Sequence, residues 1–369
     1  MASANQESIR KTRDFYAQTK GAKILQHEFG YYSLDRWISE GHIKNLEELY
    51  SLWGPDDRGM FYFYGLGWCE AAFLPPFEEK VLEDRGEYEL VQDHAGRQVL
   101  FFKGRRNGFM PEYVGHPVTD RASWERDVKW RMDPTSPGRE PDANHMAYMR
   151  DMAAQGGVMG QAVIGGYMYI RSLVGPEGAL YLFYDDPQLI HDMMEAWFNL
   201  ADATIAAHQK YAELDELFLA EDICYNHGPL ISPDMMREFL FPYYQQLITN
   251  IKARQPNKGL PVLQIDTDGD CRPVIPVYQE LGANYFSPFE VASGCDVVEL
   301  RKQYPELLMR GGIDKRELAK GKEAIDRMID RIMPFMAAEG GYIPMCDHGV
   351  PAEVDFEDYI YFRQRLKEF

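Results

Sequence analysis

The chain has 369 residues, of which 58 are acidic and 39 are basic, so its formal net charge is −19. Because such a surface repels a phosphate backbone, we expect no binding to nucleic acid. No apolar run reaches the length of a membrane span, and residues 1–20 lack the apolar core of a signal peptide, so we expect no membrane association. The five cysteines form no Cys-x-x-Cys pair, which favours reduced thiols in a cytoplasmic protein over a disulfide framework.

The first half of the chain predicts few elements. Residues 22–29 indicate an early strand, and a second strand is expected near 60–68. The segment from about 74 to 139 is rich in proline and predicts an excursion from the main fold. Within it, alternating apolar residues on both sides of Asp-His-Ala-Gly predict a β-hairpin over 85–103.

Residues 158–170 predict the next strand. Alternation would place Tyr167 and Tyr169 on one face of it, where they either fill the core or line a pocket. Pro187 then opens a long helix with an apolar stripe at the helical period.

From residue 214 onward, strands and helices alternate regularly. Ser232 is expected to cap one helix, with Pro233 in its first position. The predicted strands, each followed by a helix, are 216–222, 261–265, 283–289, 306–314 and 341–349.

This alternation predicts a parallel sheet with right-handed crossovers. Five strand–helix units, two earlier strands and one near 60–68 would close a (β/α)₈ TIM barrel. We therefore expect one α/β domain over residues 1–369, with an N-terminal extension and the hairpin insertion. An open doubly wound sheet is the alternative, but no glycine fingerprint or P-loop follows the first strand.

Acidic residues end five consecutive predicted strands. In a TIM barrel these ends converge on the active site, so the recurrence indicates a polar or metal-binding pocket. The candidate residues in this rim are Glu221, Asp222, Asp266, Asp268, Glu290, Asp314, Cys346, Asp347 and His348.

The most concentrated of these clusters is Asp-Thr-Asp-Gly-Asp at 266–270. An EF-hand is excluded because positions 6 and 12 of such a loop would be Cys271 and Val277. A phosphatase of the haloacid-dehalogenase type carries a similar Asp-x-Asp-Gly, although here Asp270 replaces the usual threonine. The remaining readings are a metal or acid–base site that Asp266 and Asp268 share with His348, and a simple turn capped by Asp270.

Three residues around this rim have more specific candidate roles. His227 follows the strand at 216–222 and either lines the pocket or caps the next helix. Tyr167 is a candidate substrate-binding residue, and Cys346 a candidate soft metal ligand.

Four motifs in the second half resemble the uroporphyrinogen decarboxylase superfamily. They are AEDICYNHGPLISP, IDTDGDCRPVIPVYQELGANYFSPFE, LMRGGIDKREL and GGYIPMCDHGVPAEVDFEDY. The resemblance covers roughly residues 158–369 and implies a (β/α)₈ barrel enzyme. The superfamily includes decarboxylases of haem synthesis and cobamide-dependent methyltransferases.

The resemblance is closer to the methyltransferase-like branch. The decarboxylases carry an N-terminal Arg-Gln-Ala-Gly-Arg segment, whereas this chain has only Arg36 in QHEFGYYSLDRW. The zinc methyltransferases bind metal through His-x-Cys and a later Cys, and these positions fall on Asp266, Asp268 and His348. The resemblance thus implies zinc or another divalent metal in an oxygen-rich site, which suits an oxygen-bound methyl donor better than a thiol.

We therefore expect a methyltransferase that moves a methyl group between a small methylated compound, such as a methoxy-aromatic one, and a corrinoid carried by a partner protein. Asp266, Asp268, His348, Glu221 and Asp222 are the expected catalytic residues, and His227, Tyr167, Glu290 and Asp314 the expected substrate-binding ones. Two alternatives stay open: a decarboxylase that uses Asp and His as acid and base, and a barrel that only binds a ligand. A homodimer is a candidate assembly.

Overall fold

The computed structural model describes residues 5–56, 59–104 and 111–369. Its centre is a curled sheet of seven parallel strands in the order β1-β6-β7-β10-β11-β12-β13. The strands are β1 (Met60–Phe63), β6 (Val158–Ile164), β7 (Glu216–Ala220), β10 (Val262–Asp266), β11 (Tyr285–Ser287), β12 (Leu308–Arg310) and β13 (Tyr342–Ile343). The predicted (β/α)₈ barrel architecture is confirmed, and the strand expected near 60–68 is β1.

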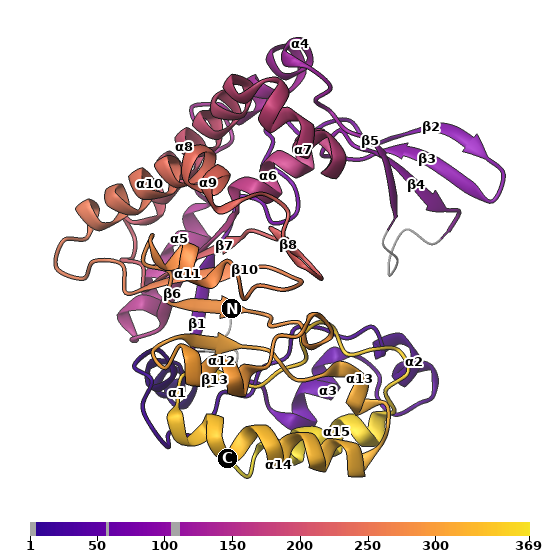
Figure 1. Cartoon of the computed structure of the whole chain (residues 1–369), viewed down its shortest axis with the longest axis vertical. Helices are drawn as coiled ribbons and strands as arrows, with labels where there is room; N and C mark the ends of the chain where they lie inside the picture. The colour runs from indigo at the N-terminus through magenta and orange to yellow at the C-terminus, as the bar shows by residue number, and fades with distance from the viewer. Residues whose placement is uncertain (1–4, 57–58, 105–110) are drawn as a thin grey trace.

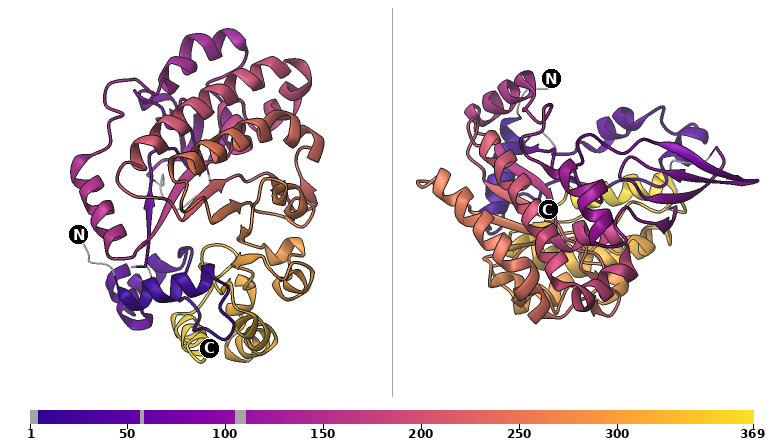
Figure 2. Two further views of the ribbon diagram at one scale, coloured as in Figure 1. Left: turned by 90° about the vertical axis from the view of Figure 1, so that its left-hand side faces the viewer. Right: turned by 90° about the horizontal axis from the view of Figure 1, so that it is seen from above.

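The strands form because their apolar runs are covered on both faces, as parallel strands require. All seven residues of β6 and all five of β7 are buried. Helices lie on the outside of the sheet (Figures 1 and 2). They include α8 (Pro187–His208), α10 (Phe241–Arg254), α14 (Lys322–Glu339) and α15 (Phe356–Leu366).

The remaining helices have 12 residues or fewer. They are α1 (Gln6–Tyr16), α2 (Leu34–Ser39), α3 (Leu46–Trp53), α4 (Arg121–Ser123), η1 (Trp124–Val128), η2 (Lys129–Met132), α5 (Ala143–Ala154), α6 (Gly166–Val174), α7 (Pro176–Asp185), α9 (Pro233–Met235), η3 (Met236–Leu240), α11 (Ile275–Gln279), η4 (Val291–Ser293), α12 (Val297–Gln303) and α13 (Lys315–Leu318). The predicted caps are present: Ser232 accepts from the backbone N–H of Met235, and Pro187 is the first residue of α8. No helix in the described ranges is long and apolar enough to cross a membrane.

The early segment 22–29 is extended but pairs with none of the described strands, which corrects the prediction made for it. The backbone N–H of Gln26 donates to the Asp56 carboxylate at 2.9 Å, and the N–H of Asp56 donates to the Gln26 carbonyl at 2.7 Å. Beside the last strand, the carboxylate of Glu28 accepts from the N–H of Cys346 at 3.0 Å. Segment 22–29 forms no regular ladder with β13, because β13 has only two residues and the Asp56 carboxylate takes the backbone N–H of Gln26.

A second correction concerns Tyr167 and Tyr169, which lie in helix α6 rather than in a strand. Strand β6 stops at Ile164, and two glycines lead into the helix. Gly165 is required because a Cβ there would lie 2.5 Å from an oxygen of Glu221. Residues two apart do not share a helix face, so the two tyrosines point differently; both are buried.

The hairpin predicted over 85–103 is confirmed and is part of a larger sheet. Strands β3 (Tyr88–Gln92) and β4 (Gln98–Phe102) pair antiparallel, and β2 (Lys80–Arg85) and β5 (Glu112–Gly115) extend them to four strands. This sheet projects from the barrel (Figure 1). Two short strands, β8 (Cys224–Tyr225) and β9 (Gly228–Pro229), form a separate pair beyond β7.

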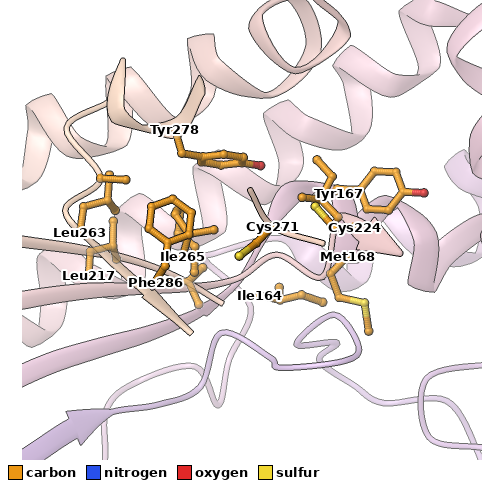
Figure 3. Close-up of a cluster of buried hydrophobic side chains, with 14 of the residues drawn as sticks. Ile164, Tyr167, Met168, Leu217, Cys224, Leu263, Ile265, Cys271, Tyr278 and Phe286 are labelled. Atoms are coloured by element: carbon orange, nitrogen blue, oxygen red, sulfur yellow. The ribbon is translucent and has the colours of Figure 1, made fainter. Parts of the chain in front are cut away.

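One large hydrophobic cluster joins the outer face of the sheet to the helices. Figure 3 shows part of it, with Leu263, Ile265 and Phe286 from the strands near Tyr278 of α11. Because this packing fixes the strands, it also fixes the loops that follow their carboxyl ends.

Candidate active site

A cavity of about 780 Å³ lies at the carboxyl ends of the strands, and we name it the outer cavity. Its volume is that of an ordinary small-molecule site. It is lined by Phe29, Tyr32, Trp68, Cys69, Arg97, Tyr113, His116, Met168, Arg171, Ser172, Pro176, Ala220, Asp222, Asp266, Asp268, Pro288, Asp347 and His348. The structure therefore brings together five of the predicted rim residues: Asp222, Asp266, Asp268, Asp347 and His348.

Asp266 is the last residue of β10 and has little exposed surface. Burial raises its pKa to about 6, although Arg310 and a hydrogen bond from the hydroxyl of Ser287 act in the opposite direction. The Nη2 atom of Arg310 lies 4.0 Å from its carboxylate. A carboxyl group with such a pKa exchanges a proton near neutral pH, as a general acid must.

Asp268 and His348 form a pair on the wall of the outer cavity. The Nε2 atom of His348 lies 3.1 Å from the Asp268 carboxylate, and this hydrogen bond raises the pKa of the imidazole. The Nδ1 atom of His348 is buried and has no hydrogen-bond partner in the described part of the chain. The pair therefore holds a proton at the cavity.

Asp222 follows β7 in a left-handed conformation, with φ of 41°. A residue other than glycine adopts this conformation at a cost, and such strain clusters at functional sites. Arg171 of α6 pairs with its carboxylate, while burial raises the pKa of Asp222. Its backbone N–H donates to the carbonyl of Asp266 at 3.0 Å, which ties the ends of β7 and β10 together.

Glu221 and Tyr167 lie outside the outer cavity, contrary to the prediction that both face the site. Glu221 is fully buried behind the strand, where it accepts from the hydroxyl of Tyr244 at 2.5 Å and from the N–H of Tyr167 at 2.9 Å. Burial raises its pKa to about 7. The side chain of Tyr167 is packed in the core cluster (Figure 3). Both residues belong to the contact between the sheet and its helices.

Four other predicted residues also do not line the outer cavity. Glu290 accepts from the N–H of Gly269 at 2.9 Å and so supports the loop at 266–270. Asp314 caps α13 and pairs with Arg316 at 2.8 Å. His227 is exposed beside Tyr225, and Cys346 is buried, which raises the pKa of its thiol.

The turn reading of Asp270 agrees with the structure. Its carboxylate accepts from the N–H of Arg272 at 3.1 Å and pairs with the Arg272 side chain at 2.7 Å. Gly269 has φ of 71°, and a Cβ there would lie 2.4 Å from the carbonyl oxygen of Tyr225. The three acids of this loop therefore do not share one role.

A sequence profile described as Uroporphyrinogen decarboxylase (URO-D) matches residues 149–369, which is more than half of the chain. The chain belongs to the uroporphyrinogen decarboxylase family. No curated protein matches it significantly.

Two solved structures resemble the whole chain. A methyltransferase from Methanosarcina mazei is 14% identical with a TM-score of 0.55, and the match covers 97% of this chain and 98% of that one. A B12-independent methionine synthase from Shewanella sp. W3-18-1, in complex with selenomethionine, is 11% identical with a TM-score of 0.40, over 95% and 96% of the two chains. At this identity the first likeness shows the fold alone, and it agrees with the barrel.

The metal site that the family resemblance implies does not assemble from the predicted ligands. Among the residues that the structure describes, no three His, Cys, Asp or Glu side chains are placed to hold a metal ion. Asp268 and His348 bond to each other, and the nearest cation to Asp266 is Arg310. Cys346 is buried beside Glu28, away from the outer cavity.

Several residues that line the outer cavity were not identified from the sequence. Arg171 directly follows the predicted strand 158–170, but it lies in helix α6, seven residues beyond the end of β6, and it was not singled out from the sequence. Arg97, Tyr113 and His116 come from the insertion and its return to the barrel, where residue type alone does not reveal a distant contact. Asp347, noted in the rim, accepts from the N–H of Val291 at 2.8 Å and faces Lys315 at 3.5 Å.

Proposed function

We propose that this chain is a methyltransferase of the uroporphyrinogen decarboxylase family in which Asp266 protonates the atom that the methyl group leaves. The observation that supports this proposal is a carboxyl group with a pKa of about 6 at the wall of a cavity of substrate size. In this step the bond between the methyl carbon and its heteroatom breaks. The methyl group passes to a nucleophilic acceptor, and the heteroatom takes the proton of Asp266.

The charges of the outer cavity favour a neutral reacting group. Arg171 pairs with Asp222, Arg97 with Asp93 at 2.7 Å, and the imidazole of His348 with Asp268. A reacting carboxylate would have to displace one of these partners and approach the remaining acids. A methylated oxygen or nitrogen on a ring avoids this cost, and its ring can pack on Phe29, Tyr32, Trp68 and Tyr113.

The family resemblance suggests a corrinoid on a partner protein as the acceptor, and that group would supply the nucleophile. In this proposal the outer cavity holds the methyl donor, and Asp266 supplies the proton to the leaving atom. The pair of Asp268 and His348 keeps a second proton at the wall, so the cavity can be reprotonated after turnover. No metal is needed for this role of Asp266.

A decarboxylase is the second candidate, because a protonated Asp266 next to Arg310 could also protonate a carbanion. The two reactions have different products. Purified protein with free reduced cobalamin and methoxybenzenes carrying a deuterated methyl group should yield deuterated methylcobalamin by mass spectrometry. Release of carbon dioxide from benzoates without any methyl acceptor, and no methyl transfer, would instead establish the decarboxylase.

A further inference from the structure

A second cavity of about 540 Å³ lies inside the barrel, and we name it the inner cavity. Its walls are largely aromatic, and Phe29 and Trp68 line both cavities. The described lining residues are Thr12, Phe15, Leu25, His27, Glu28, Phe29, Tyr50, Asp56, Met60, Tyr62, Tyr64, Trp68, Ala162, Phe218, Tyr285, Arg310 and Ile343. The proposed reaction uses no residue of this cavity except the two shared rings.

Arg310 is the only lysine or arginine among these lining residues. Its Nε atom is buried and has no hydrogen-bond partner in the described part of the chain. Its one ion-pair contact there is Asp266, at 4.0 Å from Nη2. An arginine with an unpartnered donor beside an aromatic cavity is suited to a planar anion, because its fork matches a carboxylate.

The other charged residues of the inner cavity already have partners. Asp56 pairs with Lys11 at 2.8 Å, and Glu28 lies 3.6 Å from Arg363. His27 is neutral, since burial and then Arg310 lower its pKa to about 3. The imidazole therefore adds no charge, but it can donate one hydrogen bond.

The nearby carboxyl group of Glu216 is also satisfied. It accepts from the hydroxyl of Tyr62 at 2.8 Å and from the hydroxyl of Tyr16. The amide of Gln264, with its nitrogen toward Glu216 at 2.6 Å, turns its oxygen toward Nη2 of Arg310 at 3.1 Å. This network holds the arginine in place and leaves its Nε without a partner.

We propose that the inner cavity binds the carboxylate of an aryl carboxylic acid on Arg310, with the ring against the aromatic walls. This inference rests on the proposed function for the reacting end, which would lie toward Asp266 in the outer cavity. The carboxylate held by Arg310 is stabilised as an anion, so it anchors the substrate and is not the group that reacts. The substrate class would then be methylated aryl carboxylates.

Calorimetric titration with benzoate and with benzamide, its neutral analogue, tests the anchor without any methyl acceptor. The wild-type protein should bind benzoate about ten-fold more tightly or better, as expected for a hydrogen bond to a charged group. Arg310→Gln should abolish this preference, whereas Arg97→Gln in the outer cavity should keep it. Equal binding of the two probes by the wild type, or a preference lost in Arg97→Gln and kept in Arg310→Gln, would overturn the proposal.

A second variant covers the case in which Arg310→Gln does not fold. Ala162→Leu narrows the inner cavity without a change of charge and should weaken benzoate binding about ten-fold. Unchanged benzoate binding by a folded Ala162→Leu would place the ligand elsewhere and reject the proposal.

The outcomes also separate this inference from the proposed function. A benzoate preference that depends on Arg310, without methyl transfer, would reject the function and keep the anchor. Methyl transfer from neutral aryl ethers, without a benzoate preference, would keep the proposed function and reject the anchor.

Discussion

Asp266 and Arg310 lie 4.0 Å apart, at the ends of β10 and β12, where one lines the outer cavity and the other the inner cavity. A pair at this distance is loose enough for the arginine to serve a ligand as well as the aspartate. It also explains why the pKa of Asp266 is about 6 and no higher, because Arg310 partly offsets the effect of burial. The acid and the proposed anchor are thus coupled by charge.

The first prediction concerns the pH dependence of turnover. Because Asp266 must carry a proton, kcat/KM for methyl transfer should fall as the pH rises through about 6, with a slope that approaches ten-fold per pH unit. In Asp266→Asn, the residual kcat/KM should no longer fall as the pH rises through about 6. A profile that is flat between pH 5 and 8, in steady-state assays with saturating acceptor, would contradict the role of Asp266.

The second prediction concerns stability. Burial raises the pKa of Glu221 from 4.5 to about 7, so the folded state binds the proton more tightly than the unfolded state. The free energy of unfolding should therefore decrease as the pH rises from about 4.5 to 7. In urea titrations across this range, Glu221→Gln should show a smaller decrease than the wild type, and an equal decrease would refute the assignment.

The third prediction concerns the metal that the family resemblance implies. Because the predicted ligands pair with other residues, the purified protein should contain zinc well below one equivalent, and chelation should leave methyl transfer unchanged. Elemental analysis of the wild type and of His348→Asn checks this. One equivalent of zinc that is lost in the variant would show that the ligands rearrange around a metal.

The fourth prediction concerns the loop that carries Asp268. Gly269→Ala should destabilise the fold by about 2 kcal/mol or more, because the new Cβ would overlap the Tyr225 carbonyl and because φ is 71°. Gly282→Ala is the matched control, with φ of 90° but no atom within 4 Å of the new Cβ. It should cost only about 1 kcal/mol in the same denaturant titrations. Equal losses would show that the close approach to Tyr225 is not important.

The sequence predicted the elements with a strong local signal. The strands β7, β10, β11, β12 and β13 were visible because buried apolar runs alternate with capped helices, and Asp222, Asp266, Asp268 and His348 followed from their positions at the strand ends. Position at a strand end does not decide the direction of a side chain. Glu221 and Asp222 both follow the end of β7, yet Glu221 packs against Tyr244 of α10 while Asp222, in a left-handed conformation, lines the outer cavity.

Long-range features were not predictable in this way. Arg310 lies within a predicted strand, and its role depends on what Asp266, Gln264 and Tyr285 place around it. Arg97 reaches the outer cavity only because the inserted sheet projects beside it. Segment 22–29 looked like a strand because its composition is that of one, while its actual bonding depends on Asp56.

The role of Asp266 is tested most directly by the single-turnover rate of methyl transfer to reduced cobalamin in two matched variants. Asp266→Asn keeps the size of the side chain but removes the acid, whereas Asp314→Asn changes a rim acid outside the outer cavity to another good helix cap. The account predicts a loss of roughly 100-fold or more for Asp266→Asn and a rate near that of the wild type for Asp314→Asn. A folded Asp266→Asn protein that transfers the methyl group as fast as the wild type would contradict it.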